Sequence, residues 1–130
     1  KGTADPTAPL SIGSAIETVA GMVDRGWSEV MERNRALVAA GAEIVGAALA
    51  SHERTPPHLI GSMVSFTMPP GYPAGARWDP LQDRLLYEHG IEVPITDWPH
   101  PPDRVLRISA HIYNDLDDYR ALAAALSSVL

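Results

Sequence analysis

The chain has 130 residues, a length typical of a single domain, and contains 45% hydrophobic and 20% charged residues. Its formal net charge is -6 and it has no basic run, which argues against nucleic acid as a partner. The absence of cysteine excludes disulfides, a thiolate nucleophile and cysteine-based zinc sites, and no apolar run approaches the roughly 20 residues that span a bilayer. A reducing cytoplasm is compatible with this composition. We expect a cytoplasmic protein with no membrane partner.

Apolar residues recur at three- and four-residue steps in the first part of the chain, which predicts two helices. The first runs from Thr7 or Ser11 to Asp24 and is followed by a break at residues 25–26. The second covers about residues 28–51 and carries one sustained apolar stripe. The stripe comprises Val30, Met31, Leu37, Val38, Ile44 and Val45.

The middle of the chain predicts a strand, a helix and a short strand. Residues 61–68 alternate between apolar and polar side chains, which is typical of a strand. Asp79 followed by Pro80 predicts a helix start, because aspartate caps helices and proline suits the first helical position. Gly90 is placed to end that helix, and the apolar residues 91–95 predict a short strand.

The clearest alternation covers residues 104–113. A last helix then begins at Asn114 or Asp115, with Asp117 and Asp118 favourable in its first turn. In the strand, Leu106, Ile108, Ala110 and Ile112 share one face, and Arg107, Ser109, His111 and Tyr113 share the other. This order of elements predicts a small α+β domain, with a sheet of about three strands and helices packed on its apolar face.

Arg107, Ser109 and His111 form the candidate site, because they line up on the face that the helices leave free. An arginine and a histidine in a row on a largely apolar strand indicate a surface that meets a ligand or another domain. In the competing interpretation this face is only solvated, and Arg107 pairs with a nearby acid.

Other motifs give only weak signals of a functional site. No histidine spacing predicts a metal site, so we expect none, and no G-x-S-x-G elbow supports a hydrolase triad. Gly2 and Thr3, ahead of the first helix, are similar to a short phosphate-binding turn, although such pairs usually form only a turn.

Three stretches together resemble the class V aminotransferase family of pyridoxal-phosphate (PLP) enzymes. The segment Leu-Arg-Ile-Ser-Ala-His-Ile-Tyr-Asn, residues 106–114, is similar to the C-terminal signature of that family. Leu-Gln-Asp-Arg-Leu from residue 81 and Glu-His-Gly-Ile-Glu-Val-Pro from residue 88 resemble the isopenicillin N epimerase branch. Gly-Thr-Ala-Asp-Pro, residues 2–6, resembles the Gly-Thr-x-Asp-Pro loop of that branch.

The resemblance implies an aspartate-aminotransferase-like fold and a homodimer. Residues 1–25 would be the end of the large PLP-binding domain, and residues 26–130 the small C-terminal domain that closes the site. Arg107 is implied to bind the substrate carboxylate, with His111 beside it. Gly2 and Thr3 are implied to contact the PLP phosphate of the partner subunit.

The resemblance also implies that this stretch has no catalytic residue of its own. The family's cofactor lysine lies in a Ser-x-His-Lys-type segment that the chain lacks, and the only lysine here is Lys1. We therefore expect part of a longer PLP enzyme that acts on an amino-acid-like substrate and is inactive alone. An epimerase or racemase is the first expectation, with a C–S lyase or cysteine desulfurase as the nearest enzymatic alternative. A free-standing, non-catalytic interaction domain is the alternative outside enzymes.

Overall fold

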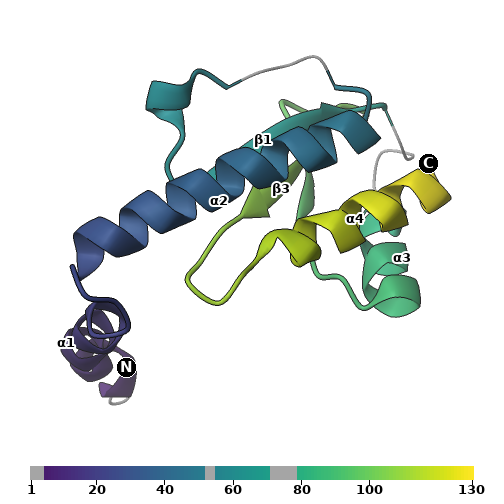
Figure 1. Cartoon of the computed structure of the whole chain (residues 1–130). Helices are drawn as coiled ribbons and strands as arrows, with labels where there is room; N and C mark the ends of the chain where they lie inside the picture. The colour runs from purple at the N-terminus through teal and green to yellow at the C-terminus, as the bar shows by residue number, and fades with distance from the viewer. Residues whose placement is uncertain (1–4, 52–54, 71–78) are drawn as a thin grey trace.

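The computed structural model describes residues 5–51, 55–70 and 79–130 of the chain. Within these residues the fold is α+β, with helices packed over a three-stranded antiparallel sheet (Figure 1). No helix in this described part is long and apolar enough to cross a membrane. In chain order the elements are α1 (Thr7–Ala20), α2 (Trp27–Ala48), the 3-10 helix η1 (Pro57–Leu59), β1 (Met63–Met68), α3 (Pro80–His89), β2 (Ile95–Asp97), β3 (Arg104–Ser109) and α4 (Leu116–Val129).

The sheet has the order β1-β3-β2, so β3 is the central strand. In β1 and β3 every second residue is buried, as the alternation in the sequence predicts. The register places Phe66 opposite Leu106, and Ser65 opposite Arg107. The sheet therefore has a covered face, with Val64, Phe66, Leu106 and Ile108, and a free face, with Ser65, Thr67, Thr96 and Arg107.

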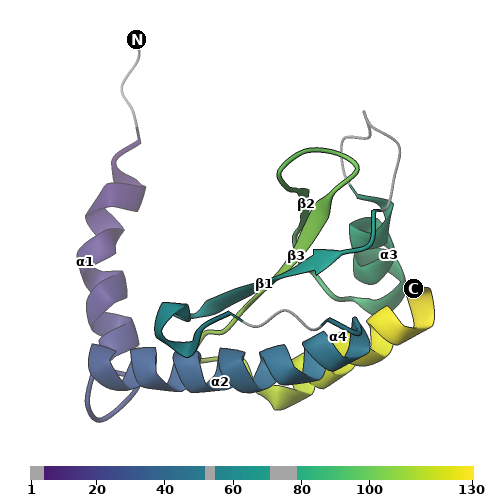
Figure 2. The same ribbon diagram turned by 90° about the horizontal axis from the view of Figure 1, so that it is seen from above.

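Helices α2 and α4 run along one side of the sheet, and α3 lies beside α4 near the end of the sheet (Figure 2). The core fills the space between this layer and the covered face. Its fully buried members include Val38 and Val45 of α2, Leu85 of α3 and Leu126 of α4. This arrangement confirms the predicted α+β domain with about three strands and helices on one face.

The signals for the ends of α3 and the start of α4 are confirmed. The side chain of Asp79 accepts a hydrogen bond from the backbone N–H of Leu81, and Gly90 ends α3 in the left-handed conformation that glycine favours. Asp115 caps α4 and forms a capping box with Asp118, so two backbone N–H groups that lack helical partners are satisfied.

Gly41 of α2 packs directly against Tyr119 of α4. A Cβ atom on this residue would stand 2.6 Å from the ring of Tyr119, well inside normal contact distance. The hydroxyl of Tyr119 donates a 2.7 Å hydrogen bond to the backbone oxygen of Ser109, at the end of β3. Gly41 therefore lets one aromatic side chain join both helices to the central strand.

Helix α1 stands apart from this layered body. It extends away from the end of α2, clear of the sheet (Figure 2), and none of its residues is buried. Its apolar side chains Leu10, Ile12 and Ile16 are 76%, 56% and 50% exposed. The predicted break between the two N-terminal helices is confirmed, since a turn separates Ala20 from Trp27.

Several predictions about element bounds and burial are wrong in detail, beginning with the first helix, which ends at Ala20 rather than Asp24. The strand predicted for residues 104–113 ends at Ser109, opposite Met63 where β1 begins, and beyond this pair the N–H of Ala110 donates one further hydrogen bond to the oxygen of Ser62. The short strand predicted for residues 91–95 lies later, at Ile95–Asp97, where it pairs with β3. In α2, Met31 is 58% exposed rather than part of the buried stripe, and Asn34 takes the interior position instead.

Candidate functional site

Arg107 lies on the free face of the sheet, on the central strand. Its side chain borders a groove of about 390 Å³ that Ser65 and Thr67 of β1, Thr96 of β2 and the ring of Trp98 also line. Because a guanidinium binds carboxylates through a planar pair of N–H groups, and hydroxyls accept or donate beside it, this groove suits a small anionic ligand.

No ion pair holds Arg107 in place among the described residues. Arg107 also lines a second hollow of about 240 Å³ that includes Glu92 and Asp118, but neither is bonded to the guanidinium. Asp118 is already engaged, since its carboxylate accepts hydrogen bonds from the Asn114 side chain and the Asp115 backbone. The backbone of Arg107 is fixed by its 3.1 Å hydrogen bond to the oxygen of Pro94. The charged group is thus held on a rigid strand while its donors stay available.

Arg104 differs from Arg107, although both belong to β3. Its side chain is turned to the covered face and forms a buried ion pair with Asp79, at 2.6 Å. The Nε group of Arg104 also donates to the oxygen of Pro69 at 2.9 Å. Asp79 in turn caps α3, so this pair joins the start of α3 to the start of β3. Of the two arginines of β3, Arg104 is therefore the one that pairs with an acid.

His111 does not share the face of Arg107, which corrects the predicted row of side chains. Beyond Ser109 the chain leaves the sheet in a turn, in which the N–H of His111 donates to the Asn114 side chain at 3.0 Å. The ring stacks on Tyr113 at 4.7 Å between centroids and lines a groove between α2 and α4. The two predicted substrate-binding residues therefore line different hollows.

The predicted phosphate turn, Gly2 and Thr3, lies outside the described residues. Immediately after it, the carboxylate of Asp5 accepts hydrogen bonds from the hydroxyl and the backbone N–H of Thr7, at the start of α1. The hydroxyl contact, followed by the backbone contact, holds the pKa of Asp5 below its ordinary value. At the start of α1 the side chain of Asp5 thus satisfies the backbone N–H of Thr7.

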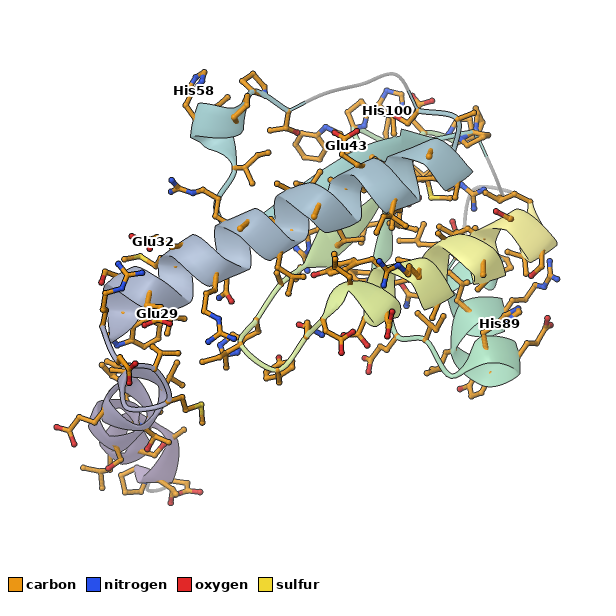
Figure 3. All side chains as sticks on the ribbon, in the orientation of Figure 1. Glu29, Glu32, Glu43, His58, His89 and His100 are labelled. Carbon is orange, nitrogen blue, oxygen red and sulfur yellow. The ribbon has the colours of Figure 1, made fainter. Side chains whose placement is uncertain are left out.

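The histidines in the described part of the chain are dispersed over the molecule. His58, His89 and His100 lie on η1, on α3 and in the turn between β2 and β3, and point in different directions (Figure 3). In the described ranges no group of three or more His, Cys, Asp or Glu side chains could hold a metal ion.

Comparison with known proteins assigns no relative. No family model matches the chain, and no curated protein matches it either. The resemblance to class V aminotransferases thus rests on the motifs alone and stays a prediction.

Two features of the site were missed in the sequence. The hydroxyls around Arg107 come from β1 and β2, and only the register of the sheet brings Ser65 and Thr96 to the same groove. Asn34 lines the groove that contains His111. A signal for it exists, because Asn34 falls four residues from both Val30 and Val38, at the spacing of a buried helical stripe.

Proposed function

We propose that this chain is the substrate-closing part of a PLP-dependent enzyme of the class V aminotransferase type, and that Arg107 binds the α-carboxylate of an amino-acid-like substrate. The observation that carries the proposal is the exposed guanidinium of Arg107, without an acidic partner in the described residues and bordered by Ser65, Thr67 and Thr96. A purely solvated face would be served equally by Lys, Glu or Thr at this position of the central strand.

The described residues do not themselves fit PLP. They include no lysine to which the cofactor could bind covalently, and the Gly2–Thr3 turn lies outside them. We therefore assign the carboxylate of the substrate to this domain and leave the cofactor to the remainder of a longer enzyme. The role of Arg107 is to bind and orient, so that the bond to be broken at the α-carbon has a fixed position.

The exposed helix α1 supports the same proposal. Its apolar residues Leu10, Ile12 and Ile16 are at least half exposed, and the proposal places residues 1–25 against the large domain or in the dimer. An epimerase or racemase is our first choice among the reactions, ahead of a C–S lyase or cysteine desulfurase. These reactions share a carboxylate-binding arginine, so Arg107 does not separate them.

A non-catalytic interaction domain is the second candidate, and the same exposed α1 favours it. Its apolar face could equally bind a protein partner, since contiguous exposed apolar surface commonly marks an interface. The two candidates differ in Arg107, which only the enzyme requires.

The test is made on the complete natural protein that carries this sequence. We expect it to contain bound PLP, visible as the absorbance band of the protein-bound cofactor. Arg107→Ala should retain the cofactor but lower kcat/KM roughly tenfold to a hundredfold, because a charge-assisted contact to the substrate is lost. Arg107→Lys should recover little, since an ammonium group lacks the planar fork.

Arg84→Ala is the matched control. Arg84 is an exposed arginine of α3 that pairs with Glu88 and does not border the groove, so its loss should leave kcat/KM unchanged. Wild-type kcat/KM in the Arg107→Ala enzyme would show that the free face is only solvated. A complete protein without PLP would favour the interaction domain.

A further inference from the structure

Asn34 and His111 line one groove on the helical side of the molecule, and each has a buried polar atom without a hydrogen-bond partner. These atoms are Oδ1 of Asn34 and Nδ1 of His111. Asn34 belongs to α2 and is only 7% exposed, while His111 lies in the turn before α4. The groove between these elements has a volume of about 560 Å³.

These atoms call for an explanation, because a buried polar group without a partner destabilises the folded state. The amide oxygen of Asn34 can only accept a hydrogen bond, so it needs a donor. The ring nitrogen of His111 accepts or donates according to its tautomer. An O–H or N–H group that reaches the amide oxygen would satisfy it, and a ligand with a second donor or an acceptor that reaches the ring nitrogen would satisfy both.

The rim of the same groove carries cationic groups. Arg33 and Arg120 line it, and their side chains are 57% and 61% exposed. The guanidinium of Arg33 lies 3.9 Å from the carboxylate of Glu29, a long ion pair, whereas the guanidinium of Arg120 contacts the carboxylate of Asp117 at 2.6 Å. The acids of the groove are engaged locally, since Asp115 caps α4 and Asp117 binds Arg120. The rim can therefore accept a carboxylate.

The wall between rim and interior is apolar. Leu37 of α2, Leu116 of α4 and Ile112 of the preceding turn are partly buried and line the groove. An aliphatic side chain of a ligand placed there would bury apolar surface of both the ligand and the groove. This burial is favourable in proportion to the area removed from water.

We propose that this groove is a binding site for an aliphatic α-amino or α-hydroxy acid. The carboxylate lies at Arg33 and Arg120, the amino or hydroxyl group donates to Asn34 and contacts His111, and the side chain packs on Leu37 and Leu116. A bridging water molecule would also satisfy the two buried atoms. It would, however, leave the arginines of the rim and the apolar wall without a ligand contact. The inference does not depend on the role proposed for Arg107.

Three probes of equal shape test the proposal. Leucine, 2-hydroxy-4-methylpentanoate and 4-methylpentanoate share a carboxylate and an isobutyl group, and differ only in the group on the α-carbon. Each is titrated into the isotope-labelled full chain while NMR follows the side-chain amide of Asn34 and the ring of His111. We expect saturable shifts at both residues with one or both of the first two probes, and affinity at least about tenfold lower for 4-methylpentanoate. The comparison of leucine with the hydroxy acid identifies the preferred donor.

Two variants complete the test. Asn34→Leu has nearly the same volume and removes the amide, so it should abolish the preference for a donor on the α-carbon. Arg120→Gln should weaken all bound probes, whereas Arg84→Gln, outside the groove, should change none of them. The Arg120 variant is at an exposed position and tests the site even where the Asn34 variant fails to fold.

Three outcomes would overturn the proposal. The first is no saturable shift at Asn34 with either donor-bearing probe, which leaves bridging water as the explanation. The second is equal affinity for all three probes, which reduces the groove to a carboxylate-binding rim. The third is an unchanged donor preference in a folded Asn34→Leu variant, or unchanged affinity in Arg120→Gln.

Discussion

The two arginines of β3 show how differently the two faces of the sheet are used. Arg104 is turned to the covered face, exposes 8% of its side chain, and is bonded to Asp79 and to the oxygen of Pro69. Arg107, three residues later, is turned to the free face and has no ion pair within the described residues. The same side chain therefore stabilises the fold on one face and is available to a ligand on the other.

The largest loss of stability is expected from a substitution at Arg104, on the covered face. Arg104→Met removes the cation and leaves the carboxylate of Asp79 buried without its partner, which should lower the free energy of unfolding by about 3–5 kcal/mol. Urea unfolding of the full chain measures it. The same substitution on the free face, Arg107→Met, is the matched comparison and should change stability by no more than about 0.5 kcal/mol. Similar losses in both variants would mean that Arg107 also has a structural role.

A smaller loss is expected where α2 packs on α4. Gly41→Ala would place a methyl group 2.6 Å from the ring of Tyr119, so the helices must separate or the ring must move. We expect a loss of about 1–3 kcal/mol in thermal or urea unfolding, reduced by the better helix propensity of alanine. Gly13→Ala in α1, where no atom lies within 4 Å of the added carbon, is the control and should not destabilise the protein. Unchanged stability in Gly41→Ala would show that the interface relaxes freely.

The covered face was largely predictable from sequence, because its signals are local. Asp79, Pro80 and Gly90 mark the ends of α3 through capping preferences that depend only on neighbouring residues. The alternation of β1 and β3 likewise separates Phe66 and Leu106 from the polar positions beside them. Each of these features is set within a few residues along the chain.

The ends and partners of the elements were less predictable, because distant segments decide them. β3 stops at Ser109 where β1 begins, and this moves His111 from the predicted row into the groove beside Asn34. The ion pair of Arg104 with Asp79 joins residues that lie 25 positions apart. Nothing near either residue indicates the other, although an arginine in phase with Leu106 and Ile108 indicates a buried partner.

The smallest effect concerns Tyr119, which joins the covered face to the end of β3. Its hydroxyl donates to the oxygen of Ser109, so Tyr119→Phe should cost about 0.5–1.5 kcal/mol at neutral pH. Burial of the ring, followed by the nearby charge of Asp118, raises the pKa of Tyr119 above its ordinary value. The folded protein then holds the phenolic proton more tightly than the unfolded chain does. The stabilisation is complete below about pH 10, the ordinary pKa of tyrosine, and is lost as the pH rises through the higher pKa of the folded state.

Stability measured from neutral to alkaline pH should therefore fall more steeply for the wild type than for Tyr119→Phe, and the difference between them should narrow above about pH 10. Tyr87→Phe is the matched control, since Tyr87 is 82% exposed on α3 and its loss should leave the alkaline slope unchanged. Parallel slopes for the wild type and Tyr119→Phe would contradict the raised pKa. Parallel slopes would mean that the hydroxyl of Tyr119 is in contact with water. The buried region on the covered face would then not extend to Ser109.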